Sequence, residues 1–202
     1  MHRTHLTAAL SSLLGLAACA TPPAEPVTSL GEKTCAAAYD LAAARSLAPP
    51  AAEQAFWEVS APLDAAAACV DGSNGLVFSL AGTEGKVVRA GTRAEPKRVV
   101  PTRVRLLDAA GRVLREWSGD AVPFRMASHV VAFTPAPGEA YLVVEAQGDR
   151  VGGSMERVAP TGYMTPSQIV VPIPAGTYPY SHEGEVLVTV GSRRTEVTDK
   201  SR

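Results

Sequence analysis

The stretch Asp71-Gly72-Ser73-Asn74-Gly75-Leu76-Val77-Phe78-Ser79-Leu80 decides the fold of this chain. Its first five residues are of the small and polar types that form turns. The five that follow make a short, mostly apolar run, bounded by that turn and of the length of a buried β-strand. The stretch therefore predicts a turn followed by a strand in the core.

The same pattern of short strands and turns continues along most of the chain. Asp108-Ala109-Ala110-Gly111 is a hairpin signal between two such strands, and the composition includes 17 Gly and 16 Pro, which suits a turn-rich protein. No helical segment separates the strands, so they predict a mainly β fold, an antiparallel β-sandwich. The strands are expected at 56–59, 76–80, 86–89, 102–107, 113–117, 129–133, 141–146 and 186–190.

One helix is expected before these strands. Residues 33–47 (KTCAAAYDLAAARSL) are rich in alanine, which has the highest helix propensity, and Pro49-Pro50 follows as a stop signal. The large side chains in this run, Tyr39, Leu41 and Leu47, are too sparse to stabilise an isolated helix. The helix is therefore expected to dock on the sandwich.

The N-terminus has the layout of a bacterial lipoprotein signal. Residues 1–18 contain a short basic start and an apolar run, and Leu16-Ala17-Ala18-Cys19 has the form of a lipobox. Cleavage before Cys19 would leave this cysteine as a lipidated N-terminus, which makes a membrane the first expected partner. Ala20, in place of an aspartate, favours the periplasmic side of the outer membrane.

The rest of the chain is expected to form one domain. Residues 19–32 contain three prolines and predict an extended tether; residues 33–192 form the domain and 193–202 a polar tail. The formal net charge is −1, which gives no indication of a nucleic-acid partner.

Two cysteines remain once Cys19 is assigned to a lipid. Cys35 and Cys69 are an even pair in an exported protein, which favours a disulfide bond. The alternative is two buried free thiols. Their spacing excludes a local metal knuckle.

No motif for catalysis, metal binding or a cofactor is evident. Ser154, His129 and His182 do not lie in a nucleophile-elbow or S-x-x-K pattern. His182-Glu183-Gly184-Glu185 has no second histidine nearby, and is more typical of a polar turn than of a zinc site. We therefore expect a non-enzymatic protein without a cofactor, although a hydrolase with unidentified residues stays open as a weaker alternative.

A basic run and several aromatic residues are the candidates for binding. The run is interrupted only by Glu95; it either forms a positive face for lipopolysaccharide or wall polymers, or consists of solvated strand edges, which we favour. Trp117, at the end of a strand, and Tyr178 and Tyr180, in a Pro-rich loop, are candidate sugar-stacking residues. The basic residues are Lys86, Arg89, Arg93, Lys97, Arg98, Arg103 and Arg105.

Seven motifs occur in an order that is similar to the maltose operon periplasmic protein family. They lie at 56–59, 75–80, 102–108, 133–136, 141–144, 172–174 and 182–190, and the resemblance covers roughly residues 52–190. It implies an exported, β-rich accessory protein linked to maltodextrin use, with no catalytic residues to transfer. The section 75–148 also resembles the pre-peptidase C-terminal type of sandwich, which is often an accessory module.

The sequence therefore predicts a lipid-anchored, non-enzymatic envelope protein. It would be accessory to the uptake of maltodextrin-type carbohydrate or to the binding of a glycan or envelope polymer. The alternative is a structural envelope lipoprotein that binds protein or lipopolysaccharide through its basic residues.

Overall fold

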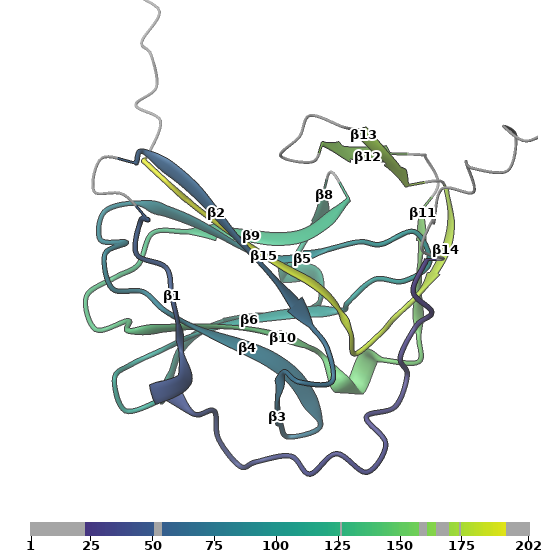
Figure 1. The fold of residues 1–202 in the computed structure, drawn as a ribbon, viewed down its shortest axis with the longest axis horizontal. Coiled ribbons are helices and arrows are strands. Elements are labelled where there is room, and N and C mark those ends of the chain that lie inside the picture. The colour runs from purple at the N-terminus through teal and green to yellow at the C-terminus, as the bar shows by residue number, and fades with distance from the viewer. Residues whose placement is uncertain are drawn as a thin grey trace, which may run out of the picture.

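The computed structural model describes residues 23–50, 54–125, 127–157, 161–164, 170–173 and 175–192, the two short ranges at 161–164 and 170–173 by their backbone. The chain is mainly β, as predicted. Two large sheets face each other, and the chain crosses between them several times (Figure 1). The only helical elements in the described ranges are the short 3-10 helices η1 (Leu41–Ala43), η2 (Gly119–Ala121) and η3 (Gly148–Arg150).

The first sheet has six strands, and β4 and β10 lie at its centre. All of its pairs are antiparallel except β1 with β4. Its path runs β1 (Arg45–Ser46), β4 (Ser73–Ser79), β10 (Tyr141–Ala146), β6 (Thr102–Leu107) and β7 (Val113–Trp117), and β3 (Ala68–Val70) also pairs with β4.

The second sheet has five strands, all antiparallel. Two separate two-stranded antiparallel sheets follow: β11 (Ser154–Arg157) with β14 (Gly176–Pro179), and β12 (Thr161–Met164) with β13 (Val170–Ile173). The order in the five-stranded sheet is β2 (Phe56–Leu63), β15 (Gly184–Gly191), β5 (Val87–Arg93), β9 (Ser128–Phe133) and β8 (Phe124–Arg125).

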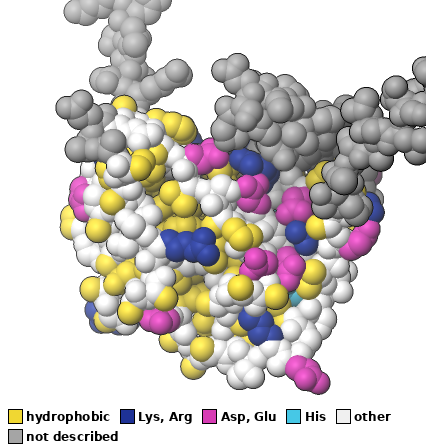
Figure 2. Space-filling view, in the orientation of Figure 1, with side chains coloured by type: hydrophobic (Ala, Val, Ile, Leu, Met, Phe, Trp, Pro, Cys, Tyr) yellow, Lys and Arg dark blue, Asp and Glu magenta, His cyan; other side chains and the backbone are white. Residues whose placement is uncertain are grey.

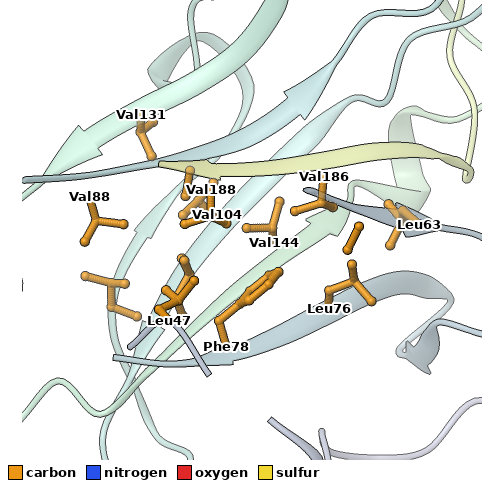
Figure 3. Packing of buried hydrophobic residues seen from close by; sticks show 14 of the residues in the cluster. Leu47, Leu63, Leu76, Phe78, Val88, Val104, Val131, Val144, Val186 and Val188 are labelled. Carbon is orange, nitrogen blue, oxygen red and sulfur yellow. The ribbon is translucent and has the colours of Figure 1, made fainter. Parts of the chain in front are cut away.

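The core fills the space between the two sheets. Val186 and Val188 of β15 point toward Leu76 and Phe78 of β4 (Figure 3), and all four are buried. Alternate residues of a strand face opposite sides of the sheet, which explains why β15 buries every second residue. Burial of each such side chain contributes about 1.5–3 kcal/mol. Leu76, Phe78 and Leu80 of the predicted strand are therefore in the core, as expected, but β4 begins at Ser73, so the predicted turn ends earlier than Gly75.

The predicted helix over residues 33–47 is wrong. This segment contains only η1 and β1, and it runs in an extended path beneath the first sheet, from the β14 side to β1 (Figure 1). Its backbone bonds to distant strands: Ala36 N–H donates to the Cys69 carbonyl at 2.9 Å and Leu47 N–H to the Ser79 carbonyl at 3.3 Å. Alanine propensity amounts to tenths of a kcal/mol per residue, so these tertiary contacts override it.

We call residues 33–47 the strap. Tyr39 and Leu41 lie on the outer face of the first sheet and pack on Val77, Leu107 and Val143, whereas Leu47 at the end of the strap is buried in the core between the sheets. Gly75 makes the packing of Tyr39 possible, because a Cβ at that position would lie 2.4 Å from the Tyr39 hydroxyl. One outer face of the molecule is therefore occupied by the chain's own N-terminal segment.

A disulfide bond holds the beginning of the strap to β3. Cys35 and Cys69 are bonded, with their Cα atoms 4.6 Å apart, which confirms the predicted pair. The bond and the Ala36–Cys69 backbone contact act at the same place. The strap is thus fixed to the sheet at its start by a covalent bond and at its end by the pairing of β1 with β4.

Part of the predicted tether 19–32 also contacts the domain. Val27 N–H donates to Ser181 Oγ at 3.0 Å, and its carbonyl accepts from His182 N–H at 2.8 Å. Glu25 forms an ion pair with Lys97. The expected domain start at Lys33 therefore lies inside a segment that is already packed. Cys19, the signal at 1–18 and the tail at 193–202 lie outside the described residues.

Candidate functional site

The outer face of the second sheet carries a groove with a cavity volume of about 570 Å³. Its floor is formed mainly by outward-facing residues of three neighbouring strands, together with the core residue Val131, and its wall by the segment from β7 to β8. We call it the outer groove. Its lining residues are Arg89, Trp117, Ala121, Pro123, Arg125, Ser128, Val130, Val131, Ala132, Leu187 and Thr189.

The alternation of side chains along each strand determines which residues form the floor of the groove. In β15 the core side takes Val186, Val188 and Val190, which leaves Leu187 and Thr189 on the opposite face. In β5 the neighbours of Arg89, Val88 and Ala90, are fully buried. The floor is thus apolar at Leu187, Val130 and Ala132, with a single basic residue, Arg89, projecting from it.

Trp117 forms part of the wall, and its orientation is fixed by packing. Its ring stacks on Phe133 with centroids 5.5 Å apart and 21° between the planes. The Arg115 guanidinium lies 5.2 Å from the Trp117 ring centroid and is itself held by Glu139, with Nη2 2.6 Å from Oε2. The sequence predicted Trp117 as a partly exposed aromatic, and the structure places it half-buried at the groove.

Two exposed arginines, Arg89 and Arg125, are the ionisable residues of the lining. No acidic side chain lines the groove, and neither arginine has an ion-pair partner within the described ranges. The groove therefore combines an apolar floor with two positive charges that this part of the chain does not neutralise.

The other basic residues of the predicted run are mostly paired or cover an aromatic ring. Arg93 lies 2.8 Å from Glu185, and Arg98 lies 2.9 Å from Glu95. Arg103 and Arg105 share the buried carboxylate of Glu145, at 3.1 and 3.3 Å.

The two lysines of the run are also engaged. Lys97 pairs with Glu25, and the Lys86 ammonium lies 5.0 Å from the Trp57 ring centroid. Acidic and basic side chains are likewise interspersed on the face shown in Figure 2.

A second, smaller hollow of about 420 Å³ adjoins the outer groove. Arg89 lines both, so the two hollows meet at this residue. The far end carries Phe56, which is 56% exposed and lies over Gly191, where a Cβ would be 3.1 Å from Phe56 Cδ2. The two hollows together cross the second sheet from β2 to β8, with an aromatic residue near each end.

Tyr178 and Tyr180 do not belong to this site. Both are buried in a separate cluster with Ala94 and Val99, and they are only 4% and 7% exposed. The Arg150 guanidinium lies 5.2 Å from the Tyr180 ring centroid and that of Arg157 5.7 Å from the Tyr178 centroid. Their burial leaves little ring surface for a sugar, because the described end of the Pro-rich segment, β14 with Tyr180, packs into the domain.

The residues considered for catalysis are also dispersed. His129 and His182 are buried, and neither is hydrogen-bonded to Ser154 within the described ranges. His129 Nδ1 lies 2.9 Å from the Val100 carbonyl, which only accepts, so this nitrogen carries the proton. Burial lowers the pKa of His129, and the charge of Arg150 adds to this effect.

The turn His182-Glu183-Gly184-Glu185 does not gather metal ligands. Glu183 lies 3.8 Å from Arg98 and Glu185 lies 2.8 Å from Arg93, so both carboxylates face cations. The described residues contain no group of three or more histidine, cysteine or acidic side chains that could hold a metal ion.

Sequence reasoning found Trp117 and Arg89 but missed Arg125 and Phe56 as surface features. Alternation within the strands is the signal that assigns Arg89, Leu187 and Thr189 to the outer side. Arg125 lies in the two-residue strand β8, which has no recognisable pattern. Phe56 has the appearance of a core residue, and only the position at the sheet edge exposes it.

No helix in the described ranges is both long and apolar enough to cross a membrane. Comparisons with protein-family models, with characterised proteins and with solved structures find no match to this chain.

Proposed function

We propose that this chain is a lipid-anchored envelope protein that binds a glycan in the outer groove without transforming it. The architecture proposed for it is an antiparallel β-sandwich whose N-terminal strap closes one outer face. Lipid on Cys19 would attach it to the periplasmic side of the outer membrane, and glycan binding would make it accessory to carbohydrate uptake.

The observation that carries the proposal is the outer groove with the fixed ring of Trp117 in its wall. Sugar-binding surfaces combine apolar area with a few polar groups that orient the ligand. Leu187, Val130 and Trp117 offer the apolar area, and Thr189 and the arginines offer the polar groups. Among the described residues, the groove lining contains no histidine, cysteine or carboxylate, which supports binding over catalysis.

The strap and the outer groove lie on opposite sides of the molecule. The strap covers the outer face of the first sheet, whereas the outer groove lies on the opposite side of the core. Maltodextrin is the ligand that the family resemblance implies, and it remains one of the glycans to be tested.

The alternative, a structural lipoprotein with a broad basic face, has less support. Arg93, Arg98, Arg103 and Arg105 are engaged with acidic side chains of the same chain. A surface whose cations are internally paired presents little net positive field. The basic run favours solvated and paired strand residues over a lipopolysaccharide-binding face.

Calorimetric titration of the full-length protein in detergent tests the proposal. Maltodextrins, cellodextrins, acidic oligosaccharides and lipopolysaccharide are the ligands to compare at millimolar concentration. Thr189→Trp, which fills the groove, should abolish the heat of glycan binding. Val113→Trp, at an exposed site on the β7 edge, is the matched control and should retain it. Absence of heat with every glycan would refute the proposed function.

A further inference from the structure

We infer that the outer groove takes a carboxylate-bearing oligosaccharide, a chain of uronic-acid type, with Arg89 and Arg125 binding its carboxylates. This inference rests on the proposed glycan-binding function and specifies the chemical class of the ligand. It comes from the charges of the groove, its shape and the positions of its two arginines.

Two positive charges distinguish the lining of the groove. Arg89 and Arg125 are exposed, and they border an apolar floor whose described lining has no acidic side chain. Guanidinium groups form their strongest hydrogen bonds with carboxylate or phosphate oxygens, in a bidentate geometry that a neutral hydroxyl does not match. A ligand with oxyanions therefore complements this groove better than a neutral sugar does.

Another arginine of the same sheet face, Arg93, is largely covered and paired with acidic side chains. Arg93 lies on β5, on the same side as Arg89, and it contacts Glu58 of β2 at 3.7 Å and Glu185 of β15 at 2.8 Å. At the level of Arg89 the corresponding neighbour on β15 is Thr189, which carries no charge. Glu58 lies on β2 at the level of Arg89, beyond Thr189, but its ion pair is with Arg93. Arg89 has no ion-pair partner in the described part of the chain and lines the groove.

The shape indicates an extended ligand. The two hollows share Arg89 and together cross the sheet from Phe56 on β2 to Arg125 on β8. Neighbouring strands lie about 4.8 Å apart, so the five strands of this sheet span roughly 19 Å from the first to the last. A chain of several sugar units fits this span better than a single sugar.

The positions of the two arginines favour carboxylates over a phosphate group. Arg89 pairs with Ala132 and Arg125 with Ser128, on strands separated by β9. Their backbone positions are therefore roughly 10 Å apart across the strands and roughly 13 Å apart along them. Two single positive charges this far apart can each bind a carboxylate on a different sugar of the chain, whereas a phosphate dianion is better matched by clustered cations.

The test is a calorimetric titration of the full-length protein in detergent with three ligands of similar length. These are hexagalacturonate, maltohexaose and a phosphorylated maltohexaose. Hexagalacturonate should bind at least about tenfold more tightly than maltohexaose at low salt, since hydrogen bonds to charged groups exceed neutral ones by about this factor. Arg89→Gln and Arg125→Gln should each remove about tenfold of that affinity, for the same reason.

Arg45→Gln is the matched control, because Arg45 is exposed on β1 of the other sheet and lines neither hollow. It should leave the affinity unchanged. Equal affinity for hexagalacturonate and maltohexaose, or preferential binding of the phosphorylated ligand, would overturn the inference while glycan binding stands. No binding by any of the three would overturn both the inference and the proposed function.

Discussion

The hydroxyl of Tyr39 donates a hydrogen bond to Glu145 Oε2, and this contact joins the strap to the centre of the first sheet. Glu145 is 1% exposed and also faces Arg103 at 3.1 Å and Arg105 at 3.3 Å. Burial, together with the neighbouring carboxylate, raises the pKa of Tyr39, so the phenol stays protonated and remains a donor. A buried carboxylate is tolerated here because each of its oxygens has a partner.

Tyr39→Phe should lower the free energy of unfolding by about 1–3 kcal/mol, because it leaves a buried carboxylate oxygen without its donor. Urea unfolding followed by tryptophan fluorescence measures this change. Tyr141→Phe is the control, since Tyr141 is half-buried on the same face and its hydroxyl has no hydrogen bond within the described ranges. Equal losses for the two variants would contradict the assigned role of the Tyr39 hydroxyl.

Gly91→Ala should be among the more damaging single-methyl additions. A Cβ at Gly91 would lie 1.7 Å from the carbonyl oxygen of His129, and this neighbour is backbone that cannot rotate away. We expect a loss of about 1–3 kcal/mol or more, in the range of overpacked sites. Urea unfolding of the variant measures this loss.

Gly75→Ala is the comparison for Gly91→Ala. Its Cβ meets the end of the Tyr39 side chain, which can move at the cost of its bond to Glu145. The loss should therefore be smaller than for Gly91→Ala. A larger loss for Gly75→Ala would show that the close approach of β5 to β9 at Gly91 is not rigid.

Stability should fall as the pH falls from about 6.5, the ordinary pKa of a histidine. Burial lowers the pKa of both His129 and His182 in the folded state, so the unfolded chain binds protons first. The free energy of unfolding therefore rises with pH between the folded-state pKa and 6.5, by at most about 1.4 kcal/mol per pH unit for each histidine.

Urea unfolding at pH 5, 6 and 7.5 measures this dependence. His129→Gln keeps a donor for the Val100 carbonyl but does not titrate, so the variant should show a shallower slope than the unmodified protein. An unchanged slope would rule out His129 as a source of the dependence. Asp108 and Glu139 have lowered pKa values, so they titrate below this window.

The strands could be predicted from the sequence because alternation and turn residues are local signals. The strands predicted at 76–80 and 186–190 are examples, since β4 and β15 include most of these residues and Leu76 and Phe78 are buried as expected. The strap could not be predicted in this way. Its alanines indicate a helix locally, but its conformation depends on Tyr39 reaching Glu145, which lies 106 residues away in the sequence.

The candidate site was predictable only in part, for a similar reason. Trp117 was identified from its place at a strand end. Whether each residue of the basic run forms an ion pair, in contrast, depends on pairing between strands that are distant in sequence. Arg103 and Glu145 are 42 residues apart, and Arg93 and Glu185 are 92 residues apart. No local pattern distinguishes those paired arginines from Arg89, and only the sheet order shows which one faces a groove.

The disulfide should make a large contribution to stability. Cys35 and Cys69 are 34 residues apart in sequence, and closing a loop of this size in the unfolded chain contributes roughly 3–4 kcal/mol on the loop-entropy model. The double variant Cys35→Ser, Cys69→Ser should lose about this amount, as measured by the urea midpoint. Thiol labelling of the unreduced, denatured protein provides the check, and two labelled thiols at these positions would show that the bond is absent.

Lipidation of Cys19 makes a prediction about fractionation that is independent of the groove. Cys19→Ser removes the sulfur that would carry lipid, so the protein should move from the membrane fraction to the soluble periplasmic fraction after osmotic shock. Several acyl chains give stable anchoring whereas one gives marginal binding, so the shift should be nearly complete. Ala20→Asp is the companion variant, expected to stay membrane-bound but to move from the outer to the inner membrane on a density gradient. Unchanged partitioning of Cys19→Ser would refute the lipid anchor.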